Sequence, residues 1–198
     1  NLDDPLPLVE ALVDAVADLE APGDNGLTPL ALAAMNGHAG AVQRLLAAGA
    51  SVDTTGYQGV PLLVGVLRDT DAATRALAPV LIAAGAAINR ADAGGWTPLM
   101  TALTRPDEAR GQGLAAARAL IAAGADLNLR NAEGDAALHV LAATPGADEP
   151  LALLLEAGAD LEATGADART PLCRATWLGR DAQAALLRAA GARDTGCR

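Results

Sequence analysis

The residues that could carry chemistry are few in this chain. Its only serine is Ser51, its cysteines are Cys173 and Cys197, and its histidines are His38 and His139. A catalytic serine or cysteine needs a neighbouring base to take up its proton, and no spacing among these residues suggests such a pair. We therefore expect no catalytic residue and no enzyme activity. The one enzymatic alternative is a thiol enzyme that uses Cys173.

Metal and cofactor motifs are absent from the sequence. It has no Cys-x-x-Cys, no His-Glu-x-x-His and no acidic calcium loop. Its glycine-rich stretches lack the preceding strand of a phosphate-binding loop. Most carboxylates stand at turns, where Asp and Asn bond their own backbone. We expect no metal and no cofactor, and because two cysteines do not make a disulfide framework, we expect both to be free thiols.

The charge balance narrows the class of partner. The formal net charge is −10, there is no lysine, and the 14 basic residues are scattered arginines. Nucleic-acid binding needs clustered cations, so we expect no nucleic-acid partner. The absence of lysine beside abundant Ala, Gly and Arg suggests a bacterial, GC-rich genome.

The sequence gives little information on compartment. No apolar run reaches transmembrane length without an interrupting Asp, Arg or Gly, so we expect no membrane insertion by this segment. No signal peptide is visible, which favours a cytoplasmic location. Because the sequence starts at Asn1 rather than at a methionine, a periplasmic or secreted location stays open.

Two motifs recur along the chain and indicate the elements that position these residues. An ending of Leu-Leu or Leu-Ile, then two or three residues, then Gly-Ala recurs, with its glycines at spacings of 36, 39, 34 and 33 residues, at Gly49, Gly85, Gly124, Gly158 and Gly191. A start of the form Gly-x-Thr-Pro-Leu falls between these endings, for example at residues 26–30 and 95–99. Threonine caps a helix whose first position suits proline, and the later glycine stops a second helix. Each unit therefore predicts a turn and two helices, which bury their apolar faces only when units stack.

This pattern resembles the ankyrin repeat, and residues 26–53 are its clearest copy. The resemblance implies an all-α ankyrin-repeat solenoid of stacked helix-turn-helix units with finger-like β-turns. It also implies structural roles for His38 in the Gly-His turn and His139 after the turn. The family's usual histidine is replaced by Ala31, Met100 and Cys173 in other repeats.

We predict one domain over residues 1–198. It begins with a half-repeat at 1–21, which is either a natural cap or the remnant of a longer array. Five repeats and a tail follow, at 22–53, 54–89, 90–128, 129–162, 163–194 and 195–198.

Three repeats are lengthened at the turn between their paired helices, at residues 68–75, 104–113 and 144–150. Insertions of this kind often mark a binding face. Surface loops also tolerate added length at small entropic cost, so both interpretations stay open.

The resemblance implies that partners bind along the turns and the concave face formed by the first helices. The three aromatic residues fall at such positions and outside the apolar slots of the repeat. Aromatic and arginine side chains dominate binding hot spots. The candidate partner-binding residues are Trp96, Trp177, Tyr57, Arg105, Arg68 and Arg169, with Met35 and Asn36 at the exposed end of the first helix. The alternative is that each ring only covers an irregular neighbouring repeat.

We therefore expect a monomeric protein-protein interaction module that binds a protein partner through the concave face and turn tips. The alternative is a regulatory or structural ankyrin segment that acts in cis within a larger enzyme or membrane protein.

Overall fold

The computed structural model describes residues 6–14, 18–104, 110–194 and 197. Contacts divide the chain into two compact units, residues 1–92 and 93–198, which are described separately. The expected single domain over residues 1–198 stays a prediction.

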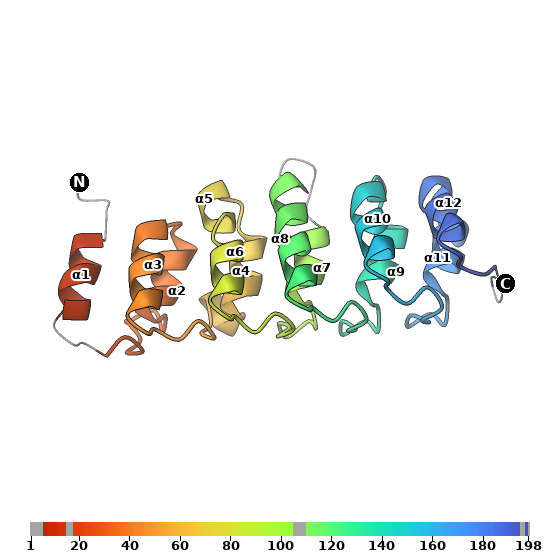
Figure 1. The fold of residues 1–198 in the computed structure, drawn as a ribbon. Coiled ribbons are helices and arrows are strands. Elements are labelled where there is room, and N and C mark those ends of the chain that lie inside the picture. The colour runs from red at the N-terminus through yellow and green to blue at the C-terminus, as the bar shows by residue number, and fades with distance from the viewer. Residues whose placement is uncertain (1–5, 15–17, 105–109, 195–196, 198) are drawn as a thin grey trace. The chain divides into compact units, whose positions relative to one another are not determined.

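The first unit is built from a lone helix followed by two repeats (Figure 1). Its lone helix α1 packs on α3. The inner helices α2 and α4 pack on each other. The described helices are α1 (Leu6–Asp14), α2 (Pro29–Met35), α3 (Ala39–Ala47), the 3₁₀ turn η1 (Tyr57–Gly59), α4 (Leu62–Arg68), α5 (Ala72–Arg75) and α6 (Ala78–Ala83).

The second unit holds three helix pairs. Its inner helices pack in the order α7, α9, α11, and the outer helices α10 and α12 pack on each other. Its described helices are α7 (Pro98–Leu103), α8 (Arg110–Ala122), α9 (Ala137–Ala143), α10 (Asp148–Glu156), α11 (Pro171–Trp177) and α12 (Asp181–Ala189).

Three inner helices begin as the Thr-Pro motif predicts. Thr28, Thr97 and Thr170 take the N-cap position, each with extended backbone, and proline follows at the first helical position. Each threonine hydroxyl accepts a hydrogen bond from the backbone N–H three residues later. This bond satisfies one of the amide groups that a helix leaves unpaired at its start.

The second and fourth repeats start without a side-chain cap. Helix α4 begins at Leu62 rather than Pro61, which takes the N-cap position, and α9 has Ala136 there. An isolated antiparallel bridge closes each of these turns, Thr55 with Pro61 and Arg130 with Ala136. In the second repeat the Leu62 N–H donates to the Thr54 carbonyl at 3.0 Å, so a backbone bond satisfies one amide group at the start of α4.

The core of both units is made of leucine and alanine. Among the described side chains, Leu30, Leu45, Leu62, Leu81, Leu99, Leu120, Leu138 and Leu154 are among the largest that are fully buried. Alanines between them let the helices approach closely. The described residues contain helices, turns and the two isolated bridges, and no extended strand. The fold class is therefore all-α, as predicted.

The lengthened segments are mostly helical where the structure describes them. Residues 68–75 comprise the end of α4, a short link and the extra helix α5, which is capped by the Asp71 side chain. Helix α10 starts at Asp148, so only residues 144–147 form a loop there. Residues 105–109 lie outside the described residues.

Candidate partner-binding surface

The most exposed large apolar side chain of the described residues is at the end of the last inner helix. Trp177 is 66% exposed at the last position of α11. The guanidinium of Arg169, in the preceding turn, lies 4.5 Å from the centroid of its ring. This cation-π contact favours one orientation of the indole, by about 0.5–1 kcal/mol at an exposed site. The structure thus brings together two predicted site residues, Arg169 and Trp177.

A network of charged side chains supports this pair. Arg174 bonds the Asp135 carboxylate in the preceding turn, and its second nitrogen lies 2.8 Å from Asp167 Oδ1. Burial favours a raised pKa for the Asp167 carboxyl, but hydrogen bonds from Arg174 and from the Arg169 backbone and side chain lower its pKa to about 2. Burial likewise disfavours the charged form of Arg174, yet its bonds to Asp135 and Asp167 raise its pKa. Both groups therefore stay charged, and they fix the fifth turn against the fourth.

Trp96 is less exposed than its position in a turn suggested. It is half-buried between Gly95 and the N-cap Thr97. Matching positions in other turns hold Leu27, which is 4% exposed, and Asp135, which is 7% exposed. The residue after the turn glycine is thus a partly covered position in several repeats. Whether Trp96 also contacts a partner stays a prediction.

Three candidates of the first unit lie at different depths. Tyr57 is 50% exposed in η1. Asn36 is exposed, and its amide donates to the Leu32 carbonyl at 2.7 Å, which caps the end of α2. Met35 is half-buried, and its sulfur lies against the next repeat, since a Cβ at Gly56 would be 3.3 Å from it. Met35 therefore joins two repeats.

The arginine candidates also differ. Arg68 is 40% exposed and forms an ion pair with Asp92, with 2.6 Å between Nη1 and Oδ2. Arg68 therefore already has an acidic partner within the chain. Arg105 lies outside the described residues.

Met35, Arg68 and Trp177 occupy the same position, the last residue of their inner helix. In the first two repeats this residue touches the start of the following turn, at Gly56 and Asp92. Trp177 holds the same position in the fifth repeat and is 66% exposed.

The two cysteines form a disulfide, so the expectation of free thiols was wrong. Cys173 and Cys197 are joined at an S–S distance of 2.01 Å, with 24 residues between them in sequence. Cys173 is 3% exposed on α11, and the tail returns beside this helix. Counting cysteines did not reveal this pairing, because only the folded repeat brings the tail back to the inner helix.

The two histidines take structural positions. His139 is fully buried, and its Nε2 lies 2.9 Å from the Ala163 carbonyl oxygen of the next repeat. Burial lowers the pKa of His139, which keeps the imidazole neutral near pH 7. His38 is half-buried at the N-cap of α3.

A ladder of side-chain oxygens joins consecutive repeats within each unit, and the sequence reasoning missed it. In each rung, a side-chain oxygen just after one outer helix accepts a backbone N–H from just after the next outer helix. The rungs are Glu20 to Ser51, Asp53 to Ala87, Asn128 to Asp160, and Glu162 to Arg193, at 2.7, 2.7, 3.1 and 3.0 Å. The recurring acidic or amide residue after the Gly-Ala ending was the available signal.

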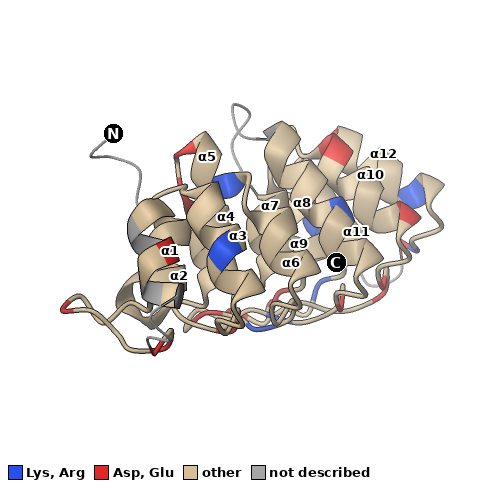
Figure 2. Cartoon of the chain, turned by 60° about the vertical axis from the view of Figure 1, so that its left-hand side comes forward, with Lys and Arg blue, Asp and Glu red and all other residues tan. Residues whose placement is uncertain are grey.

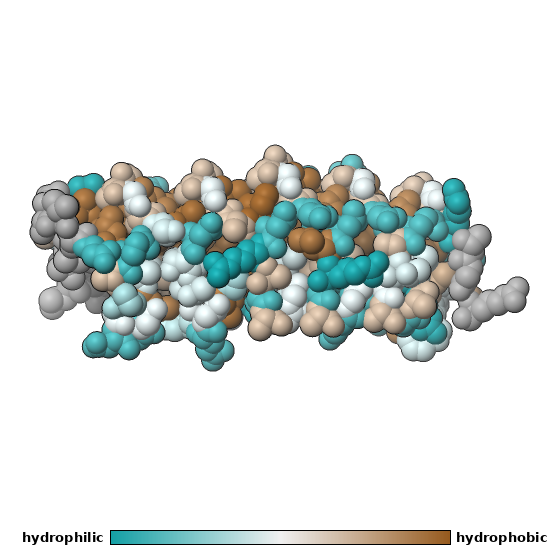
Figure 3. Space-filling model, turned by 90° about the horizontal axis from the view of Figure 1, so that it is seen from below, coloured by the Kyte–Doolittle hydropathy of each residue, from teal (hydrophilic) through white to brown (hydrophobic). Residues whose placement is uncertain are grey.

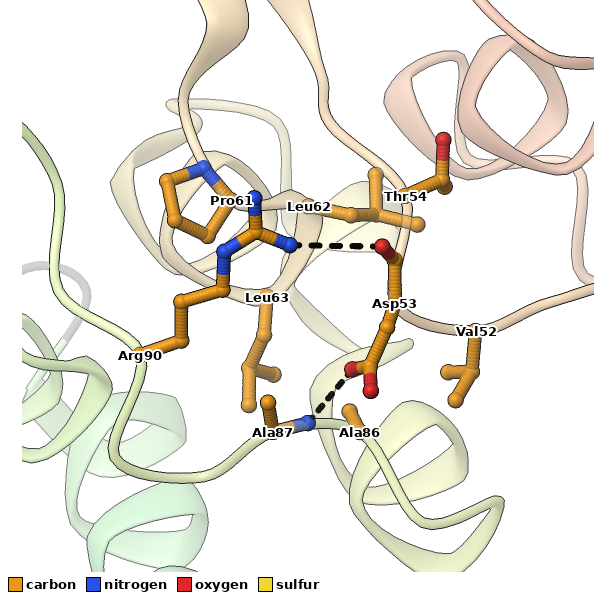
Figure 4. Close-up of a pocket in the computed structure, with 9 residues that line it drawn as sticks. All are labelled: Val52, Asp53, Thr54, Pro61, Leu62, Leu63, Ala86, Ala87 and Arg90. Carbon is orange, nitrogen blue, oxygen red and sulfur yellow. Dashed lines mark hydrogen bonds between the residues drawn. The ribbon is translucent and has the colours of Figure 1, made fainter.

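One rung borders a small pocket in the first unit. Asp53 bonds the Ala87 N–H through its carboxylate, and its carbonyl accepts a bond from Arg90 at 3.3 Å (Figure 4). The space between them holds about one water molecule, too little for an organic ligand.

The described part of the chain contains no group of three or more His, Cys, Asp or Glu residues that could hold a metal. Among its helices, none is both long and apolar enough to cross a membrane. Many of the charged residues lie at turns and helix ends in Figure 2, and hydrophilic residues cover much of the turn side seen in Figure 3.

Comparisons with known proteins agree with this repeat structure. The ankyrin repeat family model matches residues 25–57 and 94–132. The structure is similar to an ankyrin repeat domain from Acinetobacter baumannii AYE, with a TM-score of 0.81, 26% identity, and 96% and 95% of the two chains covered. The chain is an ankyrin-repeat protein.

Two further matches are a chain of a solved complex and a segment of a longer protein. A solved complex, "Bd0816 Predatory Endopeptidase from Bdellovibrio bacteriovorus in complex with immunity protein Bd3460", contains a similar chain, with a TM-score of 0.68, 28% identity, and 94% and 93% coverage. The nuclear factor NF-kappa-B p105 subunit of Gallus gallus is 34% identical over 168 residues. That match covers 83% of this chain but only 16% of the p105 subunit, so it concerns the repeats alone.

Proposed function

We propose that this chain binds a protein partner through its turn tips and the exposed ends of its inner helices, and that it has no catalytic role. The observation that carries the proposal is Trp177, 66% exposed and stacked by Arg169. An exposed tryptophan with a fixed orientation offers a large apolar contact at small entropic cost. Ankyrin repeats in general are protein-interaction modules, which supports this reading.

The net charge indicates the character of the partner. At a formal charge of −10, the chain favours a basic or neutral partner surface, an effect that acts mainly on the association rate. The complex of a predatory endopeptidase with an immunity protein contains a chain similar to this one. It supports another protein as the class of partner.

Action in cis remains the second candidate. The p105 subunit is much longer than the segment it shares with this chain, which spans 16% of it. Ankyrin repeats can therefore stand within a larger polypeptide, where they would contact another domain of the same chain.

Capture from the native cell tests the proposal. The wild-type chain, Trp177→Ala and Arg118→Ala serve as bait, and bound proteins are quantified by mass spectrometry. Arg118 is exposed on the outer helix α8 of the same unit, which makes it the matched control. We expect a protein that wild type and Arg118→Ala retain equally and that Trp177→Ala loses at least about tenfold. Equal capture by all three folded baits would contradict the proposal.

A further inference from the structure

The disulfide joins the inner helix of the fifth repeat to the segment that follows this repeat. Cys173 is the third residue of α11 and is buried, while Cys197 lies in the tail and is half-buried. The sequence separation between them is 24 residues.

The preceding repeat has a non-covalent contact with the same spacing. His139 is the third residue of α9, and its Nε2 meets the carbonyl oxygen of Ala163, 24 residues later. Ala163 belongs to the segment that enters the next turn. Cys173 and Cys197 therefore repeat this contact as a covalent bond, with the tail in place of the entering segment.

The end of the fifth repeat, just before the tail, makes the same rung as earlier repeats. The Arg193 N–H donates to Glu162 Oε1 at 3.0 Å, as the Asp160 N–H donates to Asn128 Oδ1 one repeat earlier. Next to it, Asp194 forms an ion pair with Arg188 of α12, with 3.2 Å between Nε and Oδ2. Arg193 therefore makes the rung, and Cys197 makes the inner-helix contact, of a segment that enters a further turn.

We infer that the Cys173–Cys197 disulfide is a redox-sensitive clasp: it ties residue 197 to α11 and thereby stabilises the packing of α11 and α12 in the fifth repeat. A dithiol reductant opens it by thiol–disulfide exchange at Cys197 Sγ, since Cys197 is half-buried whereas Cys173 is buried. The S–S bond breaks, a mixed disulfide forms at Cys197, and the Cys173 sulfur leaves and takes up a proton. The second thiol of the reductant then displaces Cys197, so two cysteine thiols form as the dithiol becomes a disulfide.

Two consequences follow from the clasp. The helix that it holds carries Trp177, four residues beyond Cys173, so the clasp also fixes the exposed ring. A disulfide of this kind persists in oxidising compartments and is rare in the cytosol. The clasp therefore places the working protein in the periplasm or outside the cell, rather than in the cytoplasm.

Hydrogen exchange of the full chain tests the clasp. Amides of α11 and α12 are compared in the oxidised protein, in the protein reduced with dithiothreitol, and in Cys197→Ala. A cross-link over 24 residues lowers the entropy of the locally unfolded fifth repeat and so disfavours its opening. Reduction should therefore speed amide exchange in α11 and α12 by roughly 100-fold, with little change in α2 and α3. Cys197→Ala exchanges like the reduced protein and does not respond to dithiothreitol.

Other outcomes overturn the clasp. Two alkylatable thiols in the air-oxidised folded protein would show that the disulfide does not form. Equal amide exchange of α11 and α12 in the oxidised and reduced forms would show that the disulfide does not stabilise these helices. For the compartment, rapid alkylation in living cells should leave both cysteines unmodified, and their modification would contradict an oxidising location. These measurements involve no partner, so their outcome is independent of whether the proposed binding function is correct.

Discussion

Trp96 and Trp177 differ in how far they are buried, and this difference sets what each substitution should do. Trp177 projects from the end of α11, whereas Trp96 is half-buried in its turn. The sequence identified both as residues that the repeat does not dictate. It did not reveal their exposure, because exposure depends on whether another repeat lies against the ring.

For Trp96→Ala we expect partner binding to weaken more than folding. A half-buried ring costs less to truncate than a core aromatic, whose loss costs about 3–5 kcal/mol. Chemical denaturation gives the stability change, and titration with a captured partner gives the affinity change. A loss of several kcal/mol in a variant whose folded fraction binds normally would make Trp96 a packing residue only.

His139 should make stability depend on pH. Burial lowers its pKa in the folded state, so the unfolded chain takes up a proton more readily as the pH falls below about 6.5. Stability from this group is fully present above that pH and is lost as the pH falls toward the folded pKa. Thermal unfolding between pH 8 and 5, compared with His139→Gln, should show a smaller decline in the variant. An identical decline in both proteins would assign the effect to other groups.

At the scale of the element, the turns depend on left-handed backbone. Gly95 has a φ of +73°, and a Cβ there would lie 2.6 Å from the Ala132 nitrogen and 2.7 Å from the Asn131 Cα. The next turn thus packs directly against this glycine. Ala168 takes the matching position in the fifth turn with a φ of +57°, where an L-residue is strained.

Gly95→Ala should destabilise the second unit by about 2–4 kcal/mol, since strain and collision add. Gly124→Ala is the control within the same unit, because its φ is +87° but a Cβ there meets nothing within 4 Å. Its cost should be about 1 kcal/mol, from strain alone. Urea unfolding measures both, and equal costs would show that the contact with the neighbouring turn is unimportant.

The elements were predictable where local chemistry fixes them. Thr97 with Pro98 marks the start of α7, and the glycine endings mark the stops of the outer helices. The start of α4 at Leu62 and the extra helix α5 were not predicted. Pro61 lies at the N-cap, next to its bridge with Thr55, because the backbone pairs across this turn, and the Thr-Pro motif gives no sign of that pairing.

At the scale of the whole molecule, each unit is held together by contacts between neighbouring repeats. Such arrays gain stability as a sum of units and their interfaces, so one rung should affect mainly its own unit. The spacing of the glycines predicted the number and order of the repeats. It could not predict the rungs or the disulfide, because these join residues that only stacking brings together.

Asp53→Ala should lower the free energy of unfolding of the first unit by about 0.5–1.5 kcal/mol, because the Ala87 N–H loses its acceptor. Asp24→Ala changes an exposed turn carboxylate of the same unit and serves as the control. Exchange of the Ala87 amide should accelerate only in Asp53→Ala. If both variants behave alike, the rung contributes nothing.

The binding surface itself is tested most directly by the dissociation constant of a captured partner, measured for wild type, Trp177→Ala and Arg118→Ala. We expect the dissociation constant of Trp177→Ala to rise at least about tenfold, as for an aromatic hot spot. The dissociation constant of Arg118→Ala should stay within about twofold of wild type. An unchanged constant for folded Trp177→Ala, or a larger loss for Arg118→Ala, would contradict the assignment of the partner-binding face to the inner-helix ends and turns.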